Sequence, residues 1–159
     1  MKILLIQIEK TNDSYLNEGI KIYTDRLKNY VSLSTETIVM SKSARQKPFE
    51  EQKKAEAIEI EKLFLPGDFL VCLDENGKQL KSTLFADFLN KRMVSGCKRL
   101  VFLIGGPFGI DQSILKNCNY TLSLSDMTFS HQMIRLFFCE QLYRGFSILK
   151  NEKYHHEYY

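Results

Sequence analysis

The run Arg99-Leu-Val-Phe-Leu-Ile104, followed directly by Gly105-Gly-Pro-Phe-Gly109, decides the fold predicted for this chain of 159 residues. A short apolar run that ends at glycine predicts a buried strand, because it is too short for a stable isolated helix. The glycines give a turn without obstructing side chains, as a backbone needs when it closely approaches a bound molecule. Open α/β sheets bind ligands at such carboxyl ends of strands, although a plain strand–helix turn has the same spacing. The turn is neither a dinucleotide fingerprint nor a P-loop, because no Gly-Lys-Ser/Thr follows.

Strand-like and helix-like segments alternate along the whole chain. Short apolar or β-branched runs predict further strands at Lys2–Ile8, 35–40, 68–73 and 120–124. Apolar periodicity and helix-forming composition predict helices at 12–30, 50–64, 83–94 and 131–149, with a short helix from Asp111 to Cys118. This alternation predicts a single three-layer α/β domain, residues 1–159, with a mostly parallel sheet of about five strands.

Polar segments between these elements carry turn and cap signals. Ser82 and Asp111 are suitable N-cap residues for the helices that follow them. Asp74-Glu-Asn-Gly77 has the composition of a turn after the third strand. Residues 41–47 are polar and basic, and a solvated mobile loop is favoured there over an RNA contact.

The overall composition is that of an ordinary globular protein and excludes few functions. The formal net charge is +3 with a pI of about 8.6, which permits an RNA partner without requiring one. No apolar run approaches the length of a bilayer-spanning helix, and the apolar start of the chain is too short for a signal peptide. Cys72, Cys97, Cys118 and Cys139 are too dispersed for a zinc site or a disulfide framework. We expect a cytoplasmic protein with no metal, no membrane contact and reduced thiols.

Four ordered motifs and a Tyr-His-His tail resemble the RlmH family, small bacterial SPOUT-class methyltransferases of the large ribosomal subunit. The motifs are Ile104-Gly-Gly-Pro-Phe-Gly109, Leu124-Ser-Asp-Met-Thr-Phe129, His131-Gln-Met-Ile-Arg135 and Glu140-Gln-Leu-Tyr-Arg144. The likeness covers essentially the whole chain. It implies a SPOUT-type fold with a C-terminal trefoil knot, a homodimer, and S-adenosyl-L-methionine as the methyl donor. It also implies that the target is N3 of a pseudouridine in 23S rRNA of the assembled ribosome.

The resemblance implies that the loop after the fifth strand clamps the methyl donor, together with the ends of the third and fourth strands. Small polar residues alternate there with apolar ones, which suits an adenine ring held between backbone groups and apolar side chains. Without the resemblance, a strand end followed by a helix cap would be the favoured interpretation. The expected cofactor-binding residues are Leu73, Gly105, Gly106, Leu124, Ser125, Asp126, Met127, Thr128 and Phe129.

The resemblance also implies a set of catalytic residues in the last helix and the tail. They are His131, Arg135, Glu140, Arg144, Tyr154 and His155. His131 and His155 are both candidate bases, and Arg135 or Arg144 could stabilise an anionic ring or hold a phosphate. Each position also has a plainer interpretation: a solvated histidine near a helix start, an i,i+4 ion pair between Glu140 and Arg144, and a frayed tail over 151–159.

Two further features qualify this assignment. Phe137, Phe138 and Tyr143 give the last helix more aromatic surface than one sheet face needs, which favours a subunit interface. Glu9 and Ser130 stand where the family pattern has glycine and, in many members, proline. The alternatives are a non-catalytic ribosome- or RNA-binding module that keeps the fold, and an unrelated nucleotide-binding enzyme, which the missing phosphate-binding motifs disfavour.

Overall fold

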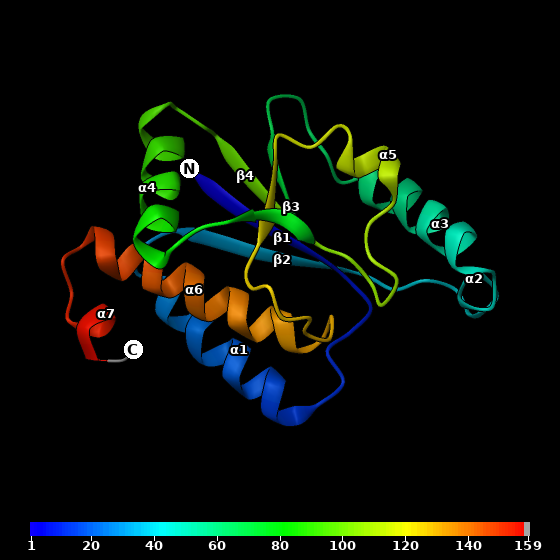
Figure 1. Ribbon diagram of the computed structural model, residues 1–159, viewed down its shortest axis with the longest axis horizontal. Helices are drawn as coiled ribbons and strands as arrows, with labels where there is room; N and C mark the ends of the chain where they lie inside the picture. Colours follow the sequence, from blue (N-terminus) through cyan, green and yellow to red (C-terminus); the bar gives the residue numbers. More distant parts are fainter. Residues whose placement is uncertain (158–159) are drawn as a thin grey trace.

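The computed structural model describes residues 1–157, in which strands and helices alternate as predicted (Figure 1). The elements are β1 (Lys2–Ile8), α1 (Ser14–Leu27), β2 (Ser32–Ile38), α2 (Lys42–Arg45), α3 (Phe49–Glu61), β3 (Phe69–Gln79), α4 (Ser82–Val94), β4 (Arg99–Ile104), α5 (Gln112–Leu115), β5 (Tyr120–Ser123), α6 (Met133–Leu149) and α7 (Tyr154–Glu157). Two tail residues of the resemblance, Tyr158 and Tyr159, lie outside the described residues.

The five strands form one sheet in the order β2-β1-β4-β3-β5, and every neighbouring pair is parallel. Helices α1, α4 and α6 cover one face, and α3 and α5 pack against the other (Figure 1). The prediction of a three-layer α/β fold with a parallel sheet of five strands is therefore confirmed. The trefoil knot implied by the resemblance stays a prediction.

The central strands β1 and β4 are covered on both faces of the sheet, which accounts for their apolar sequences. Successive side chains of β1 point to opposite faces, so that Leu5 joins the core beneath α1 and α6 while Ile6 joins the core beneath α3. All residues from Leu100 to Ile104 of β4 are at most 3% exposed. A strand covered on both faces has no position at which a polar side chain could reach water, and therefore its sequence is continuously apolar.

The segment predicted as a turn at 74–77 is instead part of β3. The strand continues to Gln79, and its register with β5 shifts so that Leu122 pairs with both Leu73 and Lys78. The residues between these two pairing positions form a bulge, which uses the same polar and glycine residues as a turn. A Cβ atom on Gly77 would lie 2.6 Å from the carbonyl carbon of Leu122, so only glycine allows this approach.

The basic segment 41–47 contains a helical turn, so the prediction of a loop there was wrong. Its centre is the helical turn α2, whose N-cap Ser41 accepts a hydrogen bond of 3.2 Å from the backbone N–H of Ala44 through its hydroxyl oxygen. Ala44 is buried, which ties the turn to the body of the protein. Ala44 is the one apolar residue of this segment, and a single small apolar residue among polar ones does not predict a helical turn.

Several element boundaries differ from the predicted ones. Ser82 is the first residue of α4 and does not cap it; its hydroxyl donates a hydrogen bond to Oε1 of Gln141 in α6. Asp111 does cap α5 as predicted, because its carboxylate accepts a hydrogen bond from the N–H of Ser113, but the helix ends at Leu115. Strand β2 begins and ends earlier than expected because its mostly exposed residues give no sharp apolar pattern. Within residues 1–157, every helix is too short or too polar to span a bilayer.

Candidate active site

A cavity of about 760 Å³, here called the main cavity, lies at the carboxyl edge of the sheet. Its walls come from the β3 bulge, the glycine turn after β4 and the segment after β5. Side chains of α3, α5 and α6 add to the lining: Lys53, Gln112, Leu115 and Ile134. Sites for small organic ligands have volumes of roughly 300–1,000 Å³ and combine apolar walls with a few polar groups. The main cavity has that size and composition, at the edge where parallel sheets bind ligands.

Eight of the nine residues expected to bind the cofactor line the main cavity. They are Leu73, Gly105, Gly106, Leu124, Ser125, Met127, Thr128 and Phe129. Asp126 does not line it, because its carboxylate accepts a hydrogen bond from the side-chain amide of Gln79. The structure therefore brings the predicted set together, and its role in cofactor binding stays a prediction.

The segment after β5 is held in shape by its own hydroxyl groups. Ser123 donates from its hydroxyl to the carbonyl oxygen of Ser125 over 3.0 Å, and the hydroxyl oxygen of Ser125 accepts a 2.9 Å hydrogen bond from the N–H of Met127. These bonds close two consecutive tight turns. Met127 is 76% exposed, so this backbone presents an accessible apolar side chain at the cavity.

The glycine turn is compact enough that side chains would obstruct it. Gly109 has φ +87°, and its N–H donates a 3.1 Å hydrogen bond to the carbonyl oxygen of Gly106. A Cβ atom on Gly105 would lie 2.9 Å from the carbonyl of Gly109. Glycine is thus required by the fold of the turn itself, which exposes backbone groups to the main cavity.

His131 is the only predicted catalytic residue among those that line the main cavity. It precedes α6, which begins at Met133 and not at residue 131 as predicted. The Gln132 side chain fixes the segment by accepting from the N–H of Asn12 and donating to the carbonyl oxygen of Lys10. Burial, and to a smaller degree the positive charge of Arg135, lower the pKa of His131 below its ordinary 6.5. The neutral ring, which can accept a proton, is therefore the favoured form at pH 7.

Arg135 is completely buried and does not line the main cavity. Its guanidinium donates a 2.9 Å hydrogen bond to the hydroxyl oxygen of Thr11 and a second one to the carbonyl oxygen of Ile8. Burial lowers the pKa of Arg135 to about 10, and the charge of Glu9 opposes this effect. Arg135 therefore holds the end of β1 against α6, while a direct contact with substrate stays a prediction.

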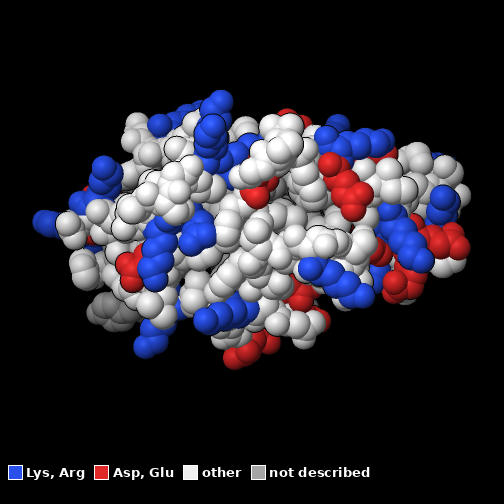
Figure 2. Space-filling model, turned by 90° about the horizontal axis from the view of Figure 1, so that it is seen from above, with Lys and Arg blue, Asp and Glu red and all other residues white. Residues whose placement is uncertain are grey.

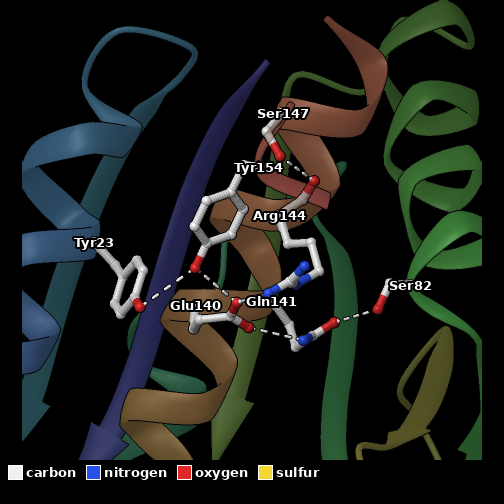
Figure 3. Close-up of polar contacts among 7 residues, drawn as sticks. All are labelled: Tyr23, Ser82, Glu140, Gln141, Arg144, Ser147 and Tyr154. Carbon is white, nitrogen blue, oxygen red and sulfur yellow. Dashed lines mark hydrogen bonds and ion pairs between the residues drawn. The ribbon is translucent and has the colours of Figure 1, made fainter. Parts of the chain in front are cut away.

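Three of the other predicted catalytic residues, Glu140 and Arg144 of α6 and Tyr154 of α7, meet in one group (Figure 3). Together with Gln141 of α6 they form what is here called the Glu140 cluster. Oε1 of Glu140 accepts hydrogen bonds from Nη2 of Arg144 at 2.6 Å and from the Tyr154 hydroxyl at 2.9 Å. Gln141 donates to Oε2 of the same carboxylate over 2.7 Å. The Arg144 guanidinium also lies 4.6 Å from the centre of the Tyr154 ring. The i,i+4 ion pair is thus present, but as part of a network that also fixes the tail.

The Glu140 cluster and the main cavity lie apart in this chain. Glu140 follows the start of α6 by seven residues, about 10 Å of helix. None of Glu140, Arg144, Tyr154 and His155 lines the main cavity. His155 lies on α7 with its Nδ1 atom buried and without a hydrogen-bond partner among residues 1–157. Six predicted catalytic residues therefore occupy separate places: the cavity, the core beside β1, and the far half of α6 with α7.

The predicted aromatic interface is only partly at the surface. Phe138 is fully buried and packs 4.7 Å from the Phe102 ring, so its assignment to an interface was wrong. Because α6 contacts the sheet and also lies between α1 and α4, it buries a wider stripe than a helix that covers only a sheet. Phe137 remains 41% exposed, and its ring centre lies 4.7 Å from that of Phe129 at the cavity.

The two departures from the family pattern have local explanations. Glu9 has φ +64°, a left-handed conformation that favours glycine. Its carboxylate accepts a 2.9 Å hydrogen bond from the N–H of Met40, which offsets part of that strain. Ser130 accepts a 3.1 Å hydrogen bond from the N–H of Met133 and so satisfies a backbone donor at the start of α6.

Sequence reasoning missed several residues of the site. Asp74, Glu75 and Asn76 line the main cavity from the β3 bulge; a polar group directly after an apolar strand was the available signal. Glu56 of α3 is only 8% exposed, and a Cβ atom on Gly106 would lie 3.2 Å from its Oε1 atom. Burial, and then the negative charge of Glu9, raise the pKa of Glu56 to about 7. Nothing in the helix-forming composition of α3 distinguishes this buried carboxyl from its exposed neighbours.

Fold and cavity together define an α/β protein with a ligand site at the carboxyl edge of a parallel sheet. A family model described as "Predicted SPOUT methyltransferase" matches residues 1–155. The chain belongs to the SPOUT methyltransferase family.

Curated relatives match almost the full chain. The "Ribosomal RNA large subunit methyltransferase H" of Christiangramia forsetii is 49% identical over 156 residues, 98% of this chain and 99% of the relative. The protein of the same name from Flavobacterium psychrophilum is 49% identical over 157 residues, 99% of this chain and all of the relative. A solved structure of a probable methylase family protein from Haemophilus influenzae has a TM-score of 0.55 at 14% identity, covering 96% of this chain and 69% of that chain. At that identity, the last similarity concerns the fold alone.

Proposed function

We propose that residues 1–159 act as one S-adenosylmethionine-dependent methyltransferase domain that modifies large-subunit rRNA. The observation that carries the proposal is the main cavity, where eight of the nine expected cofactor-binding residues converge from three separate segments of the chain. Membership of the SPOUT methyltransferase family and the names of the relatives support the same reaction. The finer proposal is that the target is N3 of a pseudouridine in 23S rRNA, in the cytoplasm and on the assembled ribosome.

The residues that line the main cavity fit S-adenosylmethionine. Leu73, Leu124 and Phe129 offer apolar surfaces for an adenine ring, and the glycine turn offers backbone groups without a Cβ barrier. The β3 bulge adds polar side chains that could form hydrogen bonds with hydroxyl or amino groups of the cofactor. When bound, this cofactor supplies an electrophilic methyl group. The chain's task is then to hold the acceptor nitrogen in line with that group and to exclude water.

The acceptor nitrogen has to lose its proton, because only the deprotonated imide is a good nucleophile. His131 is suited to take that proton on a ring nitrogen, since it lines the main cavity and its lowered pKa favours the neutral ring. His155 is the second candidate base. The resulting negative charge on the base ring would be stabilised by a guanidinium, for which Arg135 and Arg144 are the two candidates.

We propose that a homodimer completes the site. In one protomer the Glu140 cluster and His155 lie away from the main cavity, so that the catalytic residues implied by the family meet only if a second copy contributes one set. The exposed Phe137 and Phe129, at the cavity rim, offer an apolar contact for that copy. Sedimentation of the wild type and a Phe137→Asp variant would test this proposal. A monomeric variant that keeps full activity would contradict it.

The deciding experiment is transfer of labelled methyl from S-adenosylmethionine to intact ribosomes that lack the modification, with free 23S rRNA alongside. We expect label on the ribosomes at N3 of a pseudouridine and little on free rRNA, because a chain with a net charge of +3 has few groups with which to enclose RNA. Label on free rRNA alone would keep the chemistry and overturn the assembled substrate. Cofactor binding without transfer to either would favour a non-catalytic RNA-binding module.

A further inference from the structure

Two aromatic rings stack on each other at the surface beside the main cavity. Phe49, the first residue of α3, and Phe108, in the glycine turn, have ring centres 4.0 Å apart and ring planes inclined by 21°. Phe49 is 62% exposed and Phe108 38% exposed. Large aromatic side chains that remain exposed and mutually ordered mark a surface for a partner more often than isolated apolar residues do.

This pair, here called the Phe49–Phe108 stack, adjoins the site already described. Phe108 itself lines the main cavity, and Lys53, one turn after Phe49 on α3, lines it as well. Phe49 keeps 62% of its surface exposed in this arrangement, which leaves its ring accessible to a flat group. A molecule whose reacting part occupies the mouth of the main cavity would therefore extend directly over the stack.

The surrounding sequence carries the positive charge of the whole chain. Residues 41–54 contain five Lys or Arg and two Glu, an excess of three that equals the formal net charge of the protein. The remainder of the chain is therefore balanced, and Figure 2 shows Lys and Arg interspersed with Asp and Glu over the face viewed from above. Arg45 lies 3.9 Å from Glu9, whereas Lys42 and Lys47 form no ion pair within residues 1–157.

The basic segment is held in place before any partner binds. Ser41 caps α2 through its side chain, and Pro48 occupies the N-cap position of α3 directly before Phe49. The Gln52 side chain donates a 2.6 Å hydrogen bond to the carbonyl oxygen of Lys47, which fixes the link between the two helices. A surface that is already ordered loses little conformational entropy on binding.

We propose that the Phe49–Phe108 stack is a platform for an unpaired base of the RNA substrate, with phosphates of the same strand on Lys42 and Lys47. This inference rests on the proposed function and adds to it how the substrate is held. Aromatic side chains that stack bases beside cations that contact the backbone are the usual means of binding single-stranded RNA. A second copy of this chain fits less well, because a two-fold contact here would bring two equally basic segments together.

The test compares Phe49→Ala, Phe49→Leu and Phe49→Tyr in methyl transfer to ribosomes that lack the modification. Stacking one base contributes enough that we expect the KM for ribosomes to rise about 10-fold in the Ala and Leu variants. The Tyr variant, which keeps a flat ring, should stay within about threefold of the wild type. We expect kcat and the calorimetric Kd for S-adenosylmethionine to be unchanged in all three. Ile58→Ala, at another exposed apolar position of α3, is the control and should change nothing.

The charge part of the proposal has its own measurement. The Lys42→Gln/Lys47→Gln double variant should make log KM depend less steeply on log salt, by about one unit of slope for each phosphate contact removed. If Phe49→Leu were as active as the wild type, base stacking would be overturned. If Phe49→Ala shifted the monomer–dimer equilibrium, the surface would be assigned to a second copy of the chain. If the wild type transferred no methyl, the proposed function would fail, and cosedimentation of the Phe49 variants with ribosomes would still decide on the platform.

Discussion

The hydroxyl of Tyr154 donates a 2.9 Å hydrogen bond to Oε1 of Glu140, fourteen residues earlier in the chain. The same hydroxyl lies 3.4 Å from that of Tyr23 in α1, so the bond joins α7 to both α6 and α1. Burial and these hydrogen bonds raise the pKa of Tyr154, which keeps its hydroxyl protonated as a donor. The part of the tail around Tyr154 is therefore anchored, in contrast to the frayed end that chain termini usually show.

Replacing Tyr154 by Phe should loosen this anchor without creating a void. We expect the free energy of unfolding to fall by about 1 kcal/mol, the usual net contribution of a partly buried hydrogen bond. Methyl transfer should fall at least 10-fold, while the Kd for S-adenosylmethionine stays within twofold because the main cavity is untouched. Urea denaturation, labelled methyl transfer and calorimetry measure the three quantities.

Tyr15→Phe, at an exposed tyrosine, is the matched control. If cofactor affinity fell in parallel with activity, the Glu140 cluster and the main cavity would not be functionally separate.

Glu56 should make the stability of the protein depend on pH. Its pKa is raised from 4.5 to about 7, so between these values the folded protein holds a proton that the unfolded chain has released. The contribution of Glu56 to stability is therefore most favourable below about pH 4.5 and is lost as the pH rises through 7. Glu56→Gln should be more stable than the wild type by about 3 kcal/mol at pH 8 and equal to it at pH 4. Urea denaturation at both pH values measures this, with the exposed Glu61→Gln as control.

The pH profile of methyl transfer should distinguish the two candidate bases. Because the pKa of His131 is lowered below 6.5, the proton-accepting form persists at acidic pH, and the acid limb of kcat should have its midpoint below 6.5. His131→Gln should reduce kcat about 100-fold or more at pH 8 and remove this limb. We expect His155→Ala to reduce transfer with near-normal cofactor binding and to keep the limb. If His155→Ala removes the limb and His131→Gln does not, His155 is the base.

Gly77 should be intolerant of any side chain because it brings the β3 bulge against β5. An alanine Cβ would lie 2.6 Å from the carbonyl carbon of Leu122, which forces the wall of the main cavity to move. We expect Gly77→Ala to destabilise by about 1–3 kcal/mol and to weaken S-adenosylmethionine binding at least 10-fold.

Gly67→Ala is the control for this prediction. Gly67 has φ +86° with no atom within 4 Å of a Cβ, so its replacement costs about 1 kcal/mol in backbone strain and should leave cofactor affinity unchanged. Equal cofactor affinity in both variants would show that the bulge does not shape the cavity.

The sequence by itself determined the features that depend on local pattern. The continuously apolar Arg99–Ile104 predicted a central strand, and the glycines after it predicted the turn at the cavity. Strand–helix alternation then determined the parallel α/β class, because parallel neighbours need a crossover connection. The family motifs, read as a resemblance, selected the segments that line the cavity.

Only the tertiary structure decided the features that depend on distant partners. The turn-like residues at 74–77 became a bulge because β5 pairs on both sides of them, and Phe138 became core because α6 is enclosed by its neighbours. Arg135 is buried, and its guanidinium donates a hydrogen bond to the carbonyl oxygen of Ile8, 127 residues away. A polar side chain is retained in the interior when the folded chain supplies its partners, and such partners lie too far along the sequence for any local pattern to reveal them.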